Sequence, residues 1–196
     1  DQLGRQATTE YDGQQRPKRV VSPAGTSVQY SYDLNHNVVE TRAKPVPGSA
    51  LPDIVQTAAY ATHETAGRWF NRLTSQTDTV GHTTTYEYDF SNPAYGTQYG
   101  DLRKVTLPQV TDYRGQSVTA TQQFTYTTCG QPETVTDANG IVTKFEYYSP
   151  AQGGALKKAI ADFGSGAPYL NLTTELTYDS VGDVNTVTDA QGHVAE

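Results

Sequence analysis

The chain has few of the residues on which several classes of function depend. Cysteine occurs once in 196 residues, as Cys129, and methionine is absent. A single cysteine excludes an internal disulfide and a zinc site built from cysteines. Lysine and arginine number 14 against 21 aspartates and glutamates, which gives a net charge of −7. Because phosphate binding needs clustered positive side chains, this balance argues against DNA or RNA as a partner.

Long hydrophobic runs are also missing. No apolar stretch approaches the roughly 20 residues that a membrane-spanning helix requires, so no membrane span is expected in this piece. The N-terminal sequence DQLGRQATTE lacks the pattern of a signal peptide. The chain is instead rich in tyrosine, threonine, glycine and proline, with 14 tyrosines and 17 glycines. Large strand-forming residues spaced by turn-forming ones indicate β-sheet.

The segment from Tyr126 to Tyr147 contains the unit of an internal repeat. Its sequence, YTTCGQPETVTDANGIVTKFEY, has a glycine four residues after the first tyrosine, a T-D-x-x-G turn and a final aromatic-x-Tyr run. The two tyrosines are 21 residues apart. The step of 14 residues from Tyr126 to Gly140 recurs from Tyr178 to Gly192. Periods of about 20 to 50 residues are typical of repeat architectures.

Five segments that end in glycine are predicted to be hairpin turns. Aspartate can accept a hydrogen bond from the backbone two residues on, and glycine adopts a positive φ without steric penalty. The segments are 22–25 (SPAG), 77–81 (TDTVG), 111–115 (TDYRG), 136–140 (TDANG) and 188–192 (TDAQG).

Each turn is followed by a predicted strand with large side chains at alternate positions, which places them on one face. The pairs are Tyr30 and Tyr32, Tyr86 and Tyr88, Phe124 and Tyr126, Phe145 and Tyr147, and Leu176 and Tyr178. Five and eight residues before the turn glycines lie Val20 and Pro17, Gln76 and Leu73, Val110 and Leu107, Val135 and Pro132, and Val187 and Val184. A spacing of three cannot occupy one face of a straight strand, so a bulge or bend is predicted there.

Insertions interrupt the period near 40–68, 90–101 and 149–172, within what we interpret as one repeat array over 1–196. The first begins with a proline-rich loop and continues with VQTAAYAT, which alternates and is a candidate strand. The second has the composition of an irregular turn region. The third contains ALKKAIADF, where a short helix or a wide loop fits equally well.

Candidates for chemistry are few. His82 and His193 follow turn glycines, so a structural position is favoured over a metal site. The turn at Asp137 lacks the twelve-residue ligand pattern of a calcium loop. Paired aspartates could in principle act as acid and base, but their recurrence in turns favours backbone capping. We expect no catalytic residue, no metal and no cofactor. We also expect an ordinary role for Cys129, because no histidine or positively charged helix end is placed to make its thiol reactive.

The aromatic residues leave a choice open. Packing in a core or ladder is favoured for the periodic tyrosines over a surface that binds sugar or peptide. Trp69 and Phe70 stand outside the periodic positions and are candidates for contact with a partner or for filling under the first insertion. The sequence Asn171-Leu172-Thr173 matches a glycosylation acceptor.

With these features, the chain resembles the RHS/YD-repeat proteins. The resemblance covers essentially the whole chain except the insertions, and it includes a remnant of the unit at residues 1–5, DQLGR. It departs at Thr127 and Tyr148, which follow the tyrosines in place of aspartate, and at Gln15 and His36, which replace glycine. The repeat positions are Tyr11, Asp12, Gly25, Tyr30, Tyr32, Asp33, Asp78, Gly81, Tyr86, Tyr88, Asp89, Asp112, Gly115, Tyr126, Gly130, Asp137, Gly140, Tyr147, Tyr178, Asp179, Gly182, Asp189 and Gly192.

The resemblance implies an all-β array of antiparallel hairpins that forms part of the wall of a spiral, hollow shell. It implies a secreted or cell-surface protein that sequesters an enclosed C-terminal polypeptide, with the rest of its own shell as the other partner. Adhesion to a cell-surface glycan or protein is the alternative, and an enzyme has the least support. Both ends fall inside repeats without a capping unit, so an internal piece of a longer protein is expected.

Overall fold

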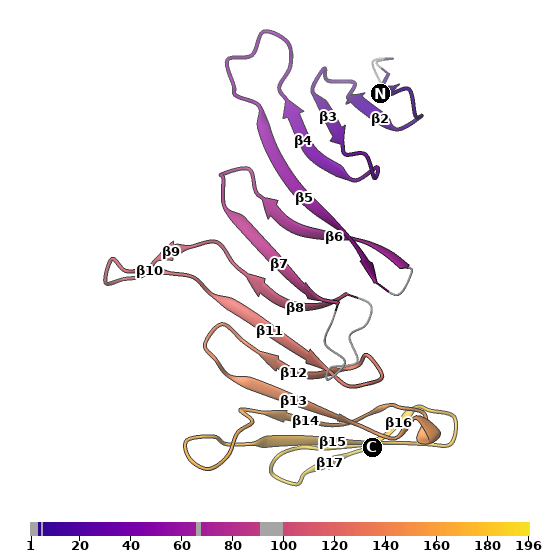
Figure 1. The fold of residues 1–196 in the computed structure, drawn as a ribbon, viewed down its shortest axis with the longest axis vertical. Helices are drawn as coiled ribbons and strands as arrows, with labels where there is room; N and C mark the ends of the chain where they lie inside the picture. Colours follow the sequence, from indigo (N-terminus) through magenta and orange to yellow (C-terminus); the bar gives the residue numbers. More distant parts are fainter. Residues whose placement is uncertain (1–3, 5, 66–67, 91–99) are drawn as a thin grey trace. The chain divides into compact units, whose positions relative to one another are not determined.

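The computed structural model describes residues 4, 6–65, 68–90 and 100–196, and its regular structure is almost entirely antiparallel β (Figure 1). The chain divides into two compact units, Asp1–Tyr86 with Leu107–Ser117, and Glu87–Thr106 with Val118–Glu196. The predicted all-β hairpin architecture is confirmed. The described residues contain no helix long and apolar enough to cross a membrane.

In the first unit each strand pairs with the next one along the chain. The strands are β1 (Thr8–Tyr11), β2 (Pro17–Val21), β3 (Ser27–Tyr32), β4 (Val38–Lys44), β5 (Ile54–Thr65), β6 (Arg68–Thr77) and β7 (Thr83–Asp89), whose last residues belong to the second unit. The candidate strand VQTAAYAT is confirmed, since it lies within β5.

In the second unit β11 pairs with β8 and β12, and the later strands follow in chain order, as Figure 1 shows for β11 to β14. The strands are β8 (Asp101–Thr106), β11 (Thr121–Tyr126), β12 (Pro132–Thr136), β13 (Val142–Tyr147), β14 (Leu156–Ala161), β15 (Leu172–Tyr178), β16 (Val184–Thr188) and β17 (Val194–Ala195). A separate ribbon pairs β9 (Val110–Thr111) with β10 (Ser117–Val118).

The third insertion differs from expectation. The segment expected to be a short helix or a wide loop is strand β14, which pairs with β13 on one side and β15 on the other. Pairing on both edges outweighs the helix preference of its alanines and lysines, because tertiary pairing overrides local propensity. A single 3₁₀ turn, Pro150–Gln152, precedes the strand. Most of the second insertion, and the terminal remnant apart from Gly4, lie outside the described residues.

The predicted bulges are present in four of the five places. The ladder gains one extra residue between Pro17 and Arg19, between Leu73 and Ser75, between Pro132 and Thr134, and between Val184 and Thr186. The fifth prediction, at Leu107 and Val110, is wrong, because Leu107 lies outside the strands and Val110 belongs to the small ribbon. Each of these four bulges lies opposite a tyrosine, namely Tyr11, Tyr60, Tyr126 and Tyr178.

Neither unit has a hydrophobic core among its described residues, where no large apolar side chain is fully buried. The periodic tyrosines of β3, β11, β13 and β15 are half-buried, so they line a sheet face rather than fill an interior. The chain exposes 13024 Å². A compact monomer of 21.3 kDa would expose roughly 9,100 Å². Large apolar side chains on the strands are also exposed, among them Val110, Leu172 and Val184.

Candidate functional site

One turn geometry recurs through both units. In nine turns of the described chain, the first residue donates its N–H to the carbonyl of the fifth at 2.8 to 3.0 Å, and the fourth donates to the carbonyl of the first at 2.9 to 3.3 Å. The fourth residue has a positive φ, from 63° to 94°. The turns begin at Asp12, Ser22, Asp33, Asp78, Asp112, Thr127, Asp137, Asp179 and Asp189. The turns at Asp12, Asp33 and Asp179, each of which follows a tyrosine, thus have the same structure as the T-D-x-x-G turns.

The side chain of aspartate at the first position caps backbone N–H groups within the turn. Its Oδ1 accepts the N–H groups of the third and fifth residues at 2.8 to 3.0 Å in all seven aspartate turns. Thr127 makes the same two contacts more weakly, at 3.3 and 3.2 Å. The hydrogen bond that the sequence predicts to the residue two positions on is present.

These hydrogen bonds lower the pKa of four turn carboxyls below their ordinary value of 3.8, because they stabilise the ionised form. In each turn the largest contribution comes from the residue four positions on. The pairs are Asp12 with the backbone N–H of Arg16, Asp33 with the side-chain amide of Asn37, Asp78 with the backbone N–H of His82, and Asp189 with the backbone N–H of His193.

Two turns carry a side chain where the others have glycine. Gln15 has φ 63° and His36 has φ 67°. The His36 ring reaches Arg16, with 3.0 Å between its Nδ1 and the Arg16 Nη1, and the Arg16 guanidinium lies 4.3 Å from the centre of the Tyr32 ring. Arg16 also pairs with Asp12 at 2.7 Å. Contacts of the His36 side chain would therefore be lost together with the backbone strain if His36 were replaced. Gln15 is the simpler position at which to test the strain.

Replacing Gln15 by glycine is expected to stabilise the hairpin of β1 and β2. Glycine removes the left-handed backbone penalty but loses more entropy on folding, which leaves a gain of roughly 0.5–1 kcal/mol. Slower hydrogen exchange at the Arg19 and Val21 amides measures this gain. Glycine at the neighbouring Gln14 is the matched control and should give no gain. Equal slowing in both variants would contradict the assignment of strain to Gln15.

Tyrosine hydroxyls connect one repeat to the preceding one, in contacts that we call tyrosine clasps. Each donates to a backbone carbonyl of the strand that precedes it in the sheet. The clasps are Tyr32 to Pro17 at 2.7 Å, Tyr126 to Leu102 at 2.8 Å, Tyr147 to Pro132 at 2.7 Å, and Tyr178 to Leu156 at 2.9 Å.

The clasps fall at the bulges, where the ladder is interrupted. Pro17 lies opposite Tyr11, Pro132 opposite Tyr126 and Leu156 opposite Tyr147. The clasps of Tyr32, Tyr147 and Tyr178 therefore end at the partner of the preceding tyrosine. Burial raises the pKa of Tyr126 and of Tyr147, which favours the protonated hydroxyl that donates. Tyrosine, bulge and hydroxyl contact therefore form one linked unit.

The opposite face of each unit carries ion pairs and threonine pairs. Arg19 bonds Glu10 at 3.0 Å in the first unit, and Lys104 bonds Glu87 at 3.0 Å in the second. Lys158 pairs with Glu175, which raises the lysine pKa. Cross-strand threonine hydroxyls also bond, as in Thr77 with Thr83, Thr125 with Thr134, and Thr177 with Thr186. One face is therefore apolar and aromatic, and the other is polar with its charges matched.

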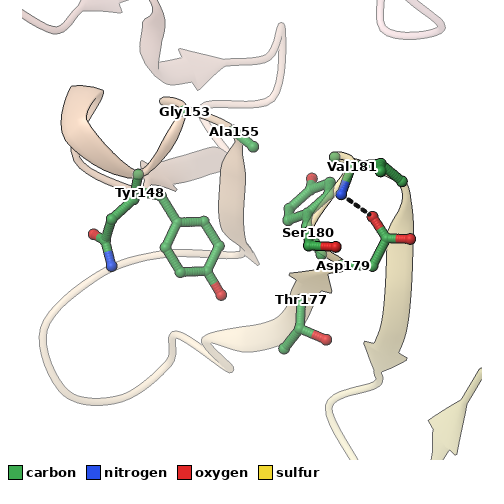
Figure 2. Close-up of a pocket in the computed structure, with 10 residues that line it drawn as sticks. Tyr148, Gly153, Ala155, Thr177, Asp179, Ser180 and Val181 are labelled. Atoms are coloured by element: carbon green, nitrogen blue, oxygen red, sulfur yellow. Dashed lines mark hydrogen bonds between the residues drawn. The ribbon is translucent and has the colours of Figure 1, made fainter.

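A pocket of about 540 Å³ opens where the repeat departs from its pattern, at Tyr148. Figure 2 shows the Tyr148 ring on one side and Thr177, Asp179 and Ser180 on the other. The Tyr148 hydroxyl donates to the carbonyl of Leu176 at 3.1 Å. Its ring meets the Tyr178 ring edge to face, with 6.1 Å between centroids. Both contacts fix the position of the Tyr148 ring.

The residues singled out in the sequence occupy defined places. Those in turns are Asp12, Gly25, Asp33, Asp78, Gly81, Asp112, Gly115, Gly130, Asp137, Gly140, Asp179, Gly182, Asp189 and Gly192. Those on strands are Tyr11, Tyr30, Tyr32, Tyr86, Tyr88, Asp89, Tyr126, Tyr147 and Tyr178. Sequence reasoning missed Tyr60, which lies opposite a bulge like the repeat tyrosines. It noted Tyr148 as a departure without assigning it a role.

The remaining candidates are dispersed. Trp69 is 70% exposed on β6, so it does not fill space beneath the insertion, and the side chain of Phe70 lies outside what the structure describes. His82 and His193 each contact the aspartate of their own turn, at 3.3 and 2.9 Å. Cys129 is exposed at the tip of a turn. In the described part of the chain, no three histidine, cysteine or acidic side chains are grouped as metal ligands.

Asn171 holds a loop closed at the start of β15. Its Oδ1 accepts the Gly164 N–H at 3.0 Å, and its Nδ2 donates to the Gly164 carbonyl at 3.1 Å. The residue has φ 50°, a conformation that asparagine tolerates better than most residues. The amide nitrogen that a glycan would modify is therefore engaged within the loop.

Changing Asn171 to alanine is expected to loosen this loop by roughly 2 kcal/mol, because two hydrogen bonds and a tolerant backbone residue are lost. Hydrogen exchange of the Gly164 amide is the measurement. Asn171→Gly keeps the backbone conformation accessible, so it should retain protection of the Leu170 amide, which donates to the Asp162 Oδ2 at 2.9 Å, while the Gly164 amide loses its acceptor in both variants. Unchanged exchange at Gly164 in the alanine variant would rule out the clamp.

The turns, bulges and clasps together define a repeat protein built from stacked β-hairpins. Residues 1–44 match the family model of the RHS repeat. This segment therefore carries the RHS repeat, which confirms the resemblance that the sequence shows to the RHS/YD-repeat proteins. No curated protein matches the chain.

Solved structures similar to the chain include three of Tc toxin components. They are the crystal structures of TcdB2-TccC3-Cdc42 (14% identity, TM-score 0.46) and TcdB2-TccC3 (15%, 0.46), and the Photorhabdus luminescens Tc holotoxin pore with mutated TccC3 (14%, 0.45). In each comparison 93% of this chain is covered. The chain spans only 11% to 12% of the length of those chains.

Proposed function

We propose that this chain is a wall segment of an RHS-type shell, whose role is to enclose another polypeptide. The observation that carries the proposal is the single-layer sheet with two unlike faces. A layer without a core gains stability by stacking hairpins and by covering its apolar face. The match to the RHS repeat and the tyrosine clasps between successive repeats support a wall that extends from repeat to repeat.

The proposed role is structural, and it assigns no catalytic residue and no cofactor. The partners are the rest of the shell and an enclosed C-terminal polypeptide, and the expected location is secreted or at the cell surface. The matched charges of the polar face suit contact with water, because paired ions add little attraction for another charged surface.

Protease protection tests enclosure. In the natural protein that contains this repeat, the non-repeat polypeptide is expected to survive a trypsin concentration that digests the same polypeptide expressed alone. Loss of protection after mild denaturation of the repeats would link it to the wall. Equal digestion of the two forms under native conditions would contradict the proposal.

Adhesion is the second candidate, and the exposure of Trp69 favours it. A tryptophan that is 70% exposed near the end of a hairpin can anchor a protein or glycan surface. Binding to cell-surface material that is lost in Trp69→Ala and kept in Tyr113→Ala, which changes another exposed ring, would support adhesion. Binding that survives both substitutions would show that Trp69 is not an adhesion contact.

A further inference from the structure

Tyr148 is a departure from the repeat that the hairpin fold does not require. The tyrosines at 11, 32, 88 and 178 are each followed by aspartate, which in the described turns caps the backbone. At Tyr147 the next residue is Tyr148, and the loop closes instead by a bond from the Tyr148 N–H to the Ala155 carbonyl at 2.9 Å. The wider loop creates the space into which the Tyr148 ring faces (Figure 2).

The pocket combines an aromatic ring with several polar groups of different kinds. Tyr148, Ala155 and Val181 offer apolar surface, while Gln152 and Ser180 offer an amide and a hydroxyl. Gln152 and Ser180 are exposed, so both can reach a ligand. Concave sites that combine apolar walls with a few placed polar groups are typical of small-molecule binding. The walls of this pocket are apolar and polar in similar measure.

The charge that lines the pocket disfavours anionic ligands. The Lys157 ammonium lies 5.7 Å from the centre of the Tyr148 ring, and Asp179 lines the pocket across from it. The Oδ1 of Asp179 is used by the N–H groups of Val181 and Asp183 at 2.9 and 3.0 Å. Among the described residues, Asp179 is the one charged residue that lines the pocket, so a phosphate would meet a carboxylate there and no cation of the lining.

We propose that the Tyr148 pocket binds a neutral pyranose sugar. The C–H face of such a ring packs against the fixed Tyr148 ring, and its hydroxyls exchange hydrogen bonds with Ser180 and Gln152. A volume of about 540 Å³ is in the range of small-ligand sites and exceeds what one water cluster needs. This site is independent of enclosure by the shell, because it depends on one loop and one neighbouring turn.

Saturation-transfer NMR on the whole chain tests the proposal with four probes: D-glucose, D-galactose, D-mannose and N-acetyl-D-glucosamine. At least one probe is expected to receive saturation, with the largest effect on its ring C–H protons. Tyr148→Ala should reduce the signal roughly tenfold, whereas Tyr148→Phe should keep most of it because the ring remains. Tyr113→Ala, which changes an 88% exposed ring outside the pocket, should leave it unchanged.

Ser180→Arg guards against a folding defect in the alanine variant. Ser180 is exposed in its turn, so arginine there should leave the hairpin intact while occupying the pocket, and the sugar signal should fall. The proposal is overturned if none of the four probes receives saturation from the unmodified chain. It is also overturned if the signal persists in Ser180→Arg.

Discussion

Replacing Tyr147 by alanine is expected to make the amides of β12 and β13 exchange with solvent on the order of a hundredfold faster, through a loss of roughly 3 kcal/mol in local stability. Two contributions are lost together. The hydroxyl bond to the Pro132 carbonyl, at 2.7 Å, disappears, and so does the half-buried ring that lies opposite the bulge before Lys158. Native-state hydrogen exchange measures the change strand by strand.

Two companion variants separate these contributions. Tyr147→Phe keeps the ring and removes only the hydroxyl, so exchange should accelerate by a smaller factor, for a cost of about 1 kcal/mol. Tyr113→Ala removes a ring that is 88% exposed and makes no clasp, and it should leave β12 and β13 unchanged. Wild-type exchange in the alanine variant would show that the clasp does not hold successive repeats together.

The turns could be predicted from sequence because their chemistry is local. Asp137 bonds backbone groups two and four residues away, and Gly140 adopts a positive φ within the same five residues. The bulges were also accessible, since the odd spacing of Pro132 and Val135 does not fit a straight strand and the ladder there gains an extra residue. Both signals lie within a few positions and need no knowledge of distant contacts.

Features that depend on strands distant in the sequence were harder to predict from it. β14 is a strand because β13 and β15 supply partners on both edges, and its own residues carry no comparable signal. Tyr60 lies opposite its bulge at Leu73, thirteen residues on, instead of the six from Tyr126 to Pro132. Because this hairpin is longer, the spacing around Tyr60 does not match the repeat in the sequence.

The Tyr148 pocket shows the same limit at the candidate site. The sequence reveals that Tyr148 replaces the expected aspartate, but not that its ring meets Tyr178, which comes thirty positions later. The contact exists because β14 and β15 pair and carry the two loops to one end of the unit. The sequence therefore showed only that Tyr148 departs from the repeat, and the strand pairing shows which residues it contacts.

Lowering the pH below 4 is expected to open the hairpins whose turns begin at Asp12, Asp33, Asp78 and Asp189. Hydrogen bonds lower the pKa of these carboxyls in the folded state below the ordinary 3.8. The folded state therefore binds protons less readily than the unfolded state. The resulting stabilisation is complete above the unfolded pKa, and it is lost as the pH falls through the lower folded value.

The chain contains its own control for this acid effect. The turn of Thr127 has the same backbone geometry with a hydroxyl as its cap, so its hydrogen bonds contain no group that titrates in this range. Protection factors from hydrogen exchange, corrected for the intrinsic pH dependence, should fall between pH 5 and pH 2 for the four aspartate turns. They should fall less for the Thr127 turn.

Asp189→Asn sharpens the test at a single site. Asparagine retains an Oδ1 that can accept the N–H groups of Gln191 and His193, which bond Asp189 at 2.9 Å, but it does not titrate. The hairpin of β16 and β17 should therefore be weaker at pH 6 in this variant, because the hydrogen bonds lose their charge assistance, and its protection should no longer fall with acid. If the asparagine variant loses protection over the same pH range as the unmodified chain, the turn carboxylate is not the group that responds to acid.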